Sequence, residues 1–283
     1  MKKQFLLIGL GAVLVPVLFF FGRTRADKKP VPAASATVKN VKKFDIQSFI
    51  AEEKTHLSPE NIVLLTKLEN GISRGDVVDQ QVKAYQQLAD FWKDSAKSYE
   101  GYVFYTAEAA KLVNSEKNLT FAARLFSENL RAEGDEAKLA WETDQAIDLY
   151  KRAIEINPNN DDLHIELGSC YIYGRGKSGD PQETMQGIQE LLTVVRKDST
   201  NMKAQMMLGV GGFVSGQYDK AIERLKKVVA AQPDNIEAIS FLADTYAAKG
   251  EKAEAIKWYT VSKRLMNNPA YSREVDERIK MLK

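Results

Sequence analysis

The feature that most constrains the fold is a pair of adjacent 34-residue segments with matching residues at matching positions. The first, residues 202–235, reads MKAQMMLGVGGFVSGQYDKAIERLKKVVAAQPDN, and the second, residues 236–269, reads IEAISFLADTYAAKGEKAEAIKWYTVSKRLMNNP. The aligned residues include Leu208 with Leu242, Gly216 with Gly250, Ala221 with Ala255 and Ile222 with Ile256. A fixed period of this length indicates a repeat architecture, in which each unit buries its apolar face against its neighbours.

Three upstream segments carry weaker copies of the pattern. Each copy has a large residue followed by a small one, namely Leu167-Gly168, Phe126-Ser127 and Leu88-Ala89. The copy with Leu167 exceeds 34 residues by seven, and GRGKSGD (174–180) is predicted to be an inter-helix loop that accommodates them. Apolar residues recur at helical spacing, and no period-two alternation is sustained after residue 43. The sequence therefore predicts an all-α fold.

This pattern resembles the tetratricopeptide repeat, a pair of antiparallel helices. The resemblance implies an α-solenoid of such helix pairs, with units at about 82–115, 120–160, 161–201, 202–235 and 236–269. The flanking residues, 44–81 and 270–283, are expected to form helices that cap the two ends of the array. In the first of these, Ser58-Pro59-Glu60 has the N-cap residue, the proline and the early acid that favour a helix start.

Residues 1–25 are predicted to be a membrane anchor. Phe5 to Gly22 is an 18-residue run without a charge, and a helix of this length spans roughly 27 Å, close to the hydrocarbon thickness of a bilayer. The alternative is a cleaved signal peptide, but basic residues follow the run where a small-x-small cleavage site is needed. We therefore expect one transmembrane helix over about 5–22, inserted in the lipid bilayer of the cell membrane, and a flexible linker over 26–43.

The membrane face of the remaining chain stays open. Four basic residues after the run, against Lys2 and Lys3 before it, favour a cytoplasmic body. A start of Met-Lys-Lys before an apolar run is also typical of an anchor whose body is exported.

Net charge differs between residues 1–43 and the rest of the chain, which we call the body. The chain has 40 Lys and Arg and 38 Asp and Glu, but residues 1–43 hold nine of the basic residues and one acid, Asp27. The body is therefore mildly acidic, which argues against a nucleic-acid partner, because such surfaces neutralise phosphates.

The motifs that carry chemistry are incomplete. Gly176-Lys177-Ser178 imitates the end of a phosphate-binding loop, but Tyr171 stands where that loop needs glycine. The single cysteine, Cys170, and the two histidines, His56 and His164, form no arrangement that suggests a nucleophile or a metal site. We predict no enzyme activity, no catalytic residue, no cofactor, no metal site and no small-molecule substrate.

The resemblance to the repeat family implies a binding groove for a protein or peptide, lined by the first helix of each pair. Carrying the family's groove positions across predicts the partner-binding residues Ile165, Glu166, Ser169, Tyr173, Lys203, Met206, Met207, Val210, Phe241 and Asp244. The same positions include Asp162, Val214, Glu237, Ser240 and Ala248. Whether neighbouring helices bury some of these side chains stays open, as does the role of the aromatic residues at 91–105, as core or as interface.

Two functions follow from these predictions. The first is a membrane-tethered, non-catalytic scaffold that binds a protein partner in its groove. The second is an extracytoplasmic envelope-assembly factor that resembles the repeat domains of cytochrome c-maturation proteins, although the sequence contains no CxxCH.

Overall fold

A computed structural model describes residues 43–73, 77–128, 130–176 and 181–283, which belong to one compact unit. These residues form helices and no strand, which confirms the predicted all-α fold. The helices are α2 (Ile46–Lys54), α3 (Pro59–Ser73), α4 (Val78–Asp94), α5 (Tyr99–Val113), α6 (Glu116–Ser127), α7 (Glu136–Ile156), α8 (Asp161–Cys170), the π-helix η1 (Tyr171–Arg175), α9 (Pro181–Lys197), α10 (Met202–Val214), α11 (Tyr218–Ala231), α12 (Ile236–Lys249), α13 (Lys252–Met266) and α14 (Pro269–Leu282).

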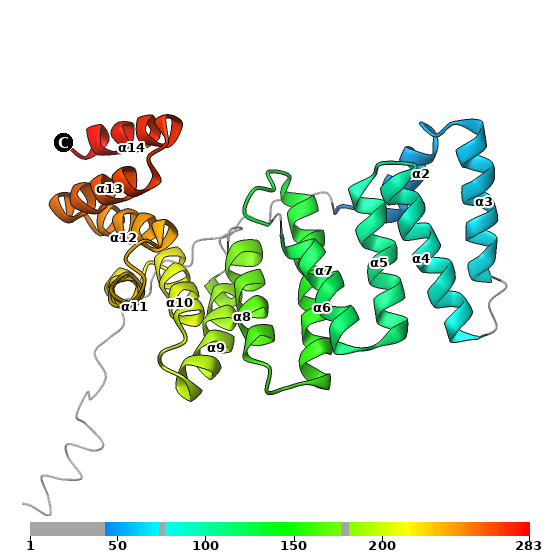
Figure 1. Ribbon diagram of the computed structural model, residues 1–283, viewed down its shortest axis with the longest axis horizontal. Helices are drawn as coiled ribbons and strands as arrows, with labels where there is room; N and C mark the ends of the chain where they lie inside the picture. The colour runs from blue at the N-terminus through cyan, green and yellow to red at the C-terminus, as the bar shows by residue number, and fades with distance from the viewer. Residues whose placement is uncertain (1–42, 74–76, 129, 177–180) are drawn as a thin grey trace, which may run out of the picture. The chain divides into compact units, whose positions relative to one another are not determined.

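The helices from α4 onward pack as consecutive pairs. The most extensive contacts join α4 with α5, α6 with α7, α8 with α9, α10 with α11, and α12 with α13. Each pair also contacts the next one along the chain, as the order of colours in Figure 1 shows. Helices α10 and α11 lie within residues 202–235, and α12 and α13 lie within residues 236–269.

Helix caps mark the start of the units. Asn201 and Asn235 stand just before α10 and α12, and the side chain of each accepts a hydrogen bond from the backbone N–H three residues later, at 3.0 and 2.9 Å. Such caps satisfy donors that the first helical turn leaves without a partner. Helix α6 begins at Glu116, four residues before the predicted start of its unit, because Ser115 caps it through the N–H of Asn118.

Small residues set the distance between paired helices. A Cβ atom added to Gly168 on α8 would lie 2.9 Å from the carbonyl oxygen of Gly187 on α9 and 2.8 Å from Cγ of Leu191. A Cβ atom on Gly209 of α10 would lie 2.7 Å from Cγ of Leu225 on α11. The small and large residues of the repeat pattern therefore meet across each pair.

The first helix of the third pair continues beyond the predicted length. Residues 171–175 extend α8 as the π-helix η1. The prediction of a loop was therefore wrong for Gly174 and Arg175, which are helical. Tyr171, Ile172 and Gly174 are buried, and a Cβ atom on Gly174 would collide with the side chain of Thr143 on α7. Burial against α7 thus favours continued helix over a loop.

The predicted anchor and linker, residues 1–25 and 26–43, lie outside the described residues except for Lys43. Within the ranges that the structure describes, no helix combines the length and the apolar character needed to cross a bilayer.

Candidate peptide-binding hollow

A hollow of about 400 Å³ is lined by the first helices of successive pairs and by two connections between helices. Its lining comes from the α6 end, the α6–α7 connection, α8, η1, α10, the α11–α12 connection and α12. The lining residues are Ser127, Glu128, Leu130, Arg131, Glu166, Ser169, Cys170, Tyr173, Met202, Lys203, Met206, Met207, Gln232, Asn235 and Glu237. The hollow therefore depends on four consecutive pairs.

Apolar side chains contribute much of this lining. Met206 and Met207, on α10, are 7% and 6% exposed, so only small parts of their side chains face solvent. Leu130 and Cys170 are also buried, and burial raises the pKa of the Cys170 thiol far above its ordinary value. Cys170 therefore contributes a neutral apolar group to the hollow.

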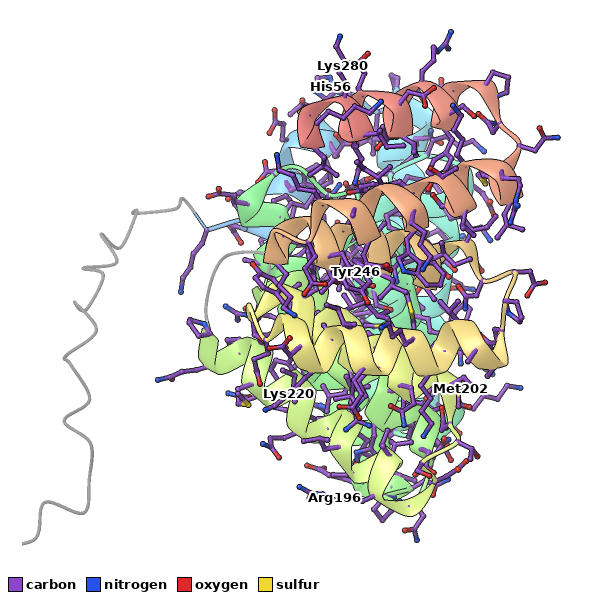
Figure 2. All side chains as sticks on the ribbon, turned by 90° about the vertical axis from the view of Figure 1, so that its left-hand side faces the viewer. His56, Arg196, Met202, Lys220, Tyr246 and Lys280 are labelled. Atoms are coloured by element: carbon purple, nitrogen blue, oxygen red, sulfur yellow. The ribbon has the colours of Figure 1, made fainter. Side chains whose placement is uncertain are left out.

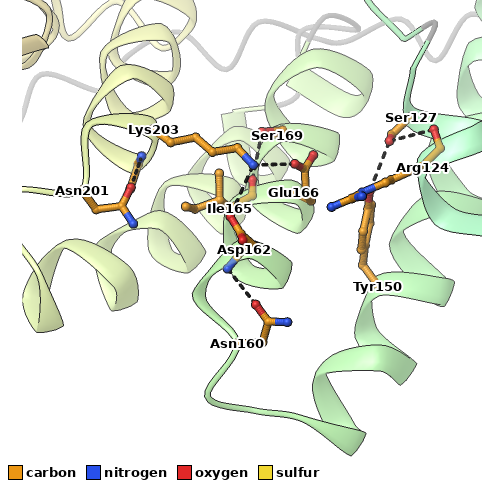
Figure 3. Close-up of polar contacts among 11 residues, drawn as sticks. Arg124, Ser127, Tyr150, Asn160, Asp162, Ile165, Glu166, Ser169, Asn201 and Lys203 are labelled. Atoms are coloured by element: carbon orange, nitrogen blue, oxygen red, sulfur yellow. Dashed lines mark hydrogen bonds and ion pairs between the residues drawn. The ribbon is translucent and has the colours of Figure 1, made fainter. Parts of the chain in front are cut away.

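Lys203, on α10, extends toward the acidic residues of α8 (Figure 3). Its Nζ atom lies 2.8 Å from Oε1 of Glu166 and 3.4 Å from Oδ1 of Asp162. Burial alone would lower the pKa of Lys203, but Glu166 and Asp162 outweigh burial and raise it. This cation is consequently held by two carboxylates of the preceding pair.

Arg131, in the α6–α7 connection, forms the second ionic contact. Its guanidinium pairs with the carboxylate of Glu237 at the start of α12, and its Cζ atom lies 4.0 Å from the ring centroid of Tyr173. Burial raises the pKa of Tyr173 above its ordinary value, with Arg131 opposing this effect and Glu237 adding to it. Tyr173 is therefore a neutral phenol, with its ring facing the guanidinium.

Six of the ten predicted partner-binding residues line the hollow: Glu166, Ser169, Tyr173, Lys203, Met206 and Met207. Ile165 and Val210 are fully buried, because the neighbouring helices cover the faces of α8 and α10 that carry them. These two side chains belong to the core and cannot touch a partner in this structure.

The two predicted residues on α12 also lie elsewhere. Phe241 is half-buried against the core, and its ring centroid is 6.0 Å from that of Phe213. Oδ1 of Asp244 accepts hydrogen bonds from Oη of Tyr259 at 2.5 Å and from Nη1 of Arg278 at 2.7 Å. Asp244 thus links α12 to α13 and α14, which is a structural role.

The sequence-based prediction did not include Glu128, Leu130 and Arg131, which also line the hollow. They lie at the end of α6 and in the connection after it, where the repeat pattern assigns no groove position. The π-helix that carries Tyr173 also has no sequence signal.

The aromatic residues at 91–105 are largely core. Phe91, Trp92 and Tyr105 are buried, while Tyr99, Tyr102 and Phe104 are half-buried against the same clusters.

His164, on α8, contacts two polar groups of this chain. Its Nδ1 atom lies 2.8 Å from Oε2 of Glu190, and its Nε2 atom lies 3.0 Å from the carbonyl oxygen of Pro158.

Two curated proteins resemble part of the chain. BBSome complex member BBS4 of Bos taurus is 26% identical over 179 residues, which cover 59% of this chain and 33% of that protein. Small glutamine-rich tetratricopeptide repeat-containing protein 2 of Mycosarcoma maydis is 29% identical over 109 residues, which cover 38% of this chain and 29% of that protein. The chain therefore spans about a third of the length of these relatives.

Solved structures that align with part of the chain include MamA 41-end from Desulfovibrio magneticus RS-1. Its TM-score is 0.49 at 17% identity, and the alignment covers 68% of this chain and 97% of that one. Another is YrrB, described as "a TPR protein with an unusual peptide-binding site", with a TM-score of 0.47 and 15% identity, covering 74% of this chain and 97% of that one.

Family models match two parts of the chain. One described as "Tetratricopeptide repeat" matches residues 215–273, and one described as "TPR repeat" matches residues 142–172. These segments include α11 to α13 and parts of the α7 and α8 region. The predicted tetratricopeptide repeats are thus confirmed over these residues, and the chain contains such repeats within a larger array of helix pairs.

Proposed function

We propose that this chain is a non-catalytic scaffold that binds a segment of another protein in the hollow between α6 and α12. The observation that carries the proposal is the lining itself. It combines adaptable methionine side chains with charged groups at hydrogen-bonding distance from one another. Methionine surfaces adapt to apolar peptide side chains, while fixed charges orient a backbone or a polar group.

We further propose that residues 5–22 tether the scaffold to the cell membrane. The apolar run of the sequence supports this part of the proposal. Tethering raises the local concentration of the scaffold near other membrane proteins, so a modest affinity suffices for capture.

Site-specific photocrosslinking in cells tests the binding site. A benzophenone amino acid replaces Lys203, whose exposed side chain lines the hollow, or Lys220, an exposed control on α11. Figure 2 shows Lys220 well apart from Met202, which lines the hollow. We expect a discrete protein adduct from position 203 and none from position 220. Equal adducts from both positions, or none from either, would contradict the assigned site.

A steric variant makes this test specific. Ser169→Trp places a large side chain in the hollow, whereas Ser199→Trp adds the same bulk at an exposed position outside the lining. Only the first substitution is expected to remove the adduct from position 203. Far-UV circular dichroism checks that both variants stay helical.

Two separate experiments measure whether the chain associates with membranes and on which face of the membrane its body lies. The full chain should stay with membranes after carbonate extraction, and a variant without residues 1–25 should not. A reporter fused after Lys283 then identifies the face. The envelope-assembly hypothesis requires an extracytoplasmic signal, and a cytoplasmic signal would eliminate it.

A further inference from the structure

The contact between Arg131 and Glu237 joins parts of the array that are far apart in the sequence. The two residues are separated by 106 positions. Most helix contacts in the described residues join elements that are neighbours along the chain, as expected for a repeat array. Arg131 instead reaches from the connection after α6 to the first turn of α12, and both residues line the hollow.

The surroundings of the Arg131 side chain match those that bind guanidinium groups in recognition sites. One partner is an aromatic ring, with Cζ 4.0 Å from the centroid of Tyr173. Another partner is the carboxylate of Glu237. Arginine binds preferentially where it can stack on an aromatic face and pair with a carboxylate at the same time.

The balance of charge around the hollow also favours a cationic ligand. The lining includes three carboxylates, on Glu128, Glu166 and Glu237, and two cations, on Arg131 and Lys203. Both cations already contact carboxylates of this chain, and Asp162 adds a further negative charge beside Lys203. An anionic ligand would compete with these carboxylates for the two cations, whereas an arginine could replace Arg131 and leave Glu237 paired.

We propose that Arg131 occupies, from within the chain, a subsite for an arginine side chain of the partner. The partner segment presents that arginine beside apolar side chains, which contact Met206 and Met207. On binding, the ligand's guanidinium replaces that of Arg131 between Tyr173 and Glu237. This inference rests on the proposed function, because it names the chemistry of the segment that the hollow binds.

Display selection measures the ligand preference of the hollow and does not require the identity of the partner protein. The full-length protein in detergent micelles is the bait, and a library of random dodecapeptides is the probe. We expect enriched peptides to share one arginine flanked by apolar residues. Enrichment of aspartate or glutamate, or of apolar peptides with no arginine, would overturn the subsite while leaving the proposed function standing. A failure to enrich any peptide would count against both.

Affinity measurements on one selected peptide then test the mechanism, with fluorescence anisotropy as the readout. Glu237→Gln should weaken binding about tenfold, and Tyr173→Leu about fivefold, as expected for loss of a charged partner or of a stacked ring. Arg131→Ala should tighten binding about threefold or more, because the competing side chain is gone. Glu223→Gln is the control, because Glu223 is an exposed carboxylate on α11 that does not line the hollow, and it should change affinity less than twofold.

The sign of the Arg131→Ala effect separates two ligand chemistries. If the ligand were anionic and bound to Arg131, this variant would weaken binding, and that result would overturn the proposal. A peptide whose arginine is changed to glutamine provides an independent test on the unaltered protein. On the wild-type protein, this glutamine peptide should bind about tenfold more weakly than the parent peptide. On the Glu237→Gln variant, the two peptides should bind with nearly equal affinity. An equal loss on both proteins would also overturn the proposal.

Discussion

Glu142, on α7, is a carboxylic acid with only 2% of its surface exposed. Its Oε2 atom has no hydrogen-bond partner among the described residues. Burial raises the pKa of Glu142 to about 7, opposed by Lys138 and reinforced by Glu133 and Glu100. A buried carboxylate without full compensation costs stability when it is ionised.

Glu142→Gln should therefore stabilise the protein at alkaline pH. The folded state keeps the proton of Glu142 up to about pH 7, whereas the unfolded state loses it near the ordinary value of 4.5. Wild-type stability consequently falls as the pH rises through this window. We expect the variant to gain about 1–3 kcal/mol in the free energy of unfolding at pH 8 and little at pH 5, as measured by urea denaturation.

Glu155→Gln is the matched control for this measurement, because Glu155 is an exposed residue of the same helix. Its free energy of unfolding should differ from wild type by the same small amount at both values of pH. An equal gain for Glu142→Gln at pH 5 and pH 8 would show that ionisation is not the cause.

Six of the ten residues that the repeat pattern assigns to the groove line the hollow, and their role in partner binding stays a prediction. Met206, Met207 and Lys203 lie in the hollow, but Ile165 and Val210 are buried by helices whose approach depends on packing beyond their own unit. Arg131 could not be found in this way, because its partner Glu237 lies 106 positions away and its connection has no repeat signature. Long-range contacts of this kind depend on the stacking of several pairs.

At the scale of elements, the crossing of α8 and α9 depends on two glycines. Any side chain on Gly168 meets the backbone of Gly187, which cannot move without shifting the helix. Gly168→Ala should therefore lower the free energy of unfolding by about 1–3 kcal/mol, as overpacking does. A thermal melt should show a decrease of a few degrees.

Gly71→Ala provides the comparison in another helix. A Cβ atom on Gly71 of α3 would lie 3.7 Å from Cβ of Ala84, an ordinary contact. This substitution should raise stability by up to about 1 kcal/mol, because alanine favours helix over glycine. If both variants had a higher melting temperature than wild type, the contact between Gly168 and Gly187 would tolerate a Cβ atom, contrary to this prediction.

The same glycine pattern explains why helices were predictable from the sequence and their ends were less so. Large and small residues at a fixed period specify which helices pair, as with Gly209 and Leu225. The ends depend on single capping residues such as Ser115 and on burial against another unit, as at Gly174. Those interactions add or remove a turn without changing the repeat pattern.

At the scale of the whole described array, the core consists of three clusters. One includes residues of α2 to α5, a second lies from α5 to η1, and the third extends from α8 to α14. Because most contacts join neighbours, a local substitution should loosen one part of the array and leave distant parts intact.

Hydrogen exchange with mass spectrometry can measure this independence. Trp92→Ala removes a fully buried side chain of the first cluster and should accelerate exchange in α2 to α5, with little change in α10 to α13. Leu242→Ala, in the third cluster, should produce the opposite distribution. Uniform acceleration along the chain in either variant would mean that the array unfolds as a single cooperative unit.

The lining of the hollow extends from Ser127 to Glu237, so it draws on more than a hundred residues of chain. During synthesis, domains fold from the N-terminus as they leave the ribosome. Helices α2 to α5 contribute nothing to the lining and can pack before it exists. A nascent chain therefore cannot form the complete hollow until α12 has emerged from the ribosome, so the proposed partner can be captured only after that point.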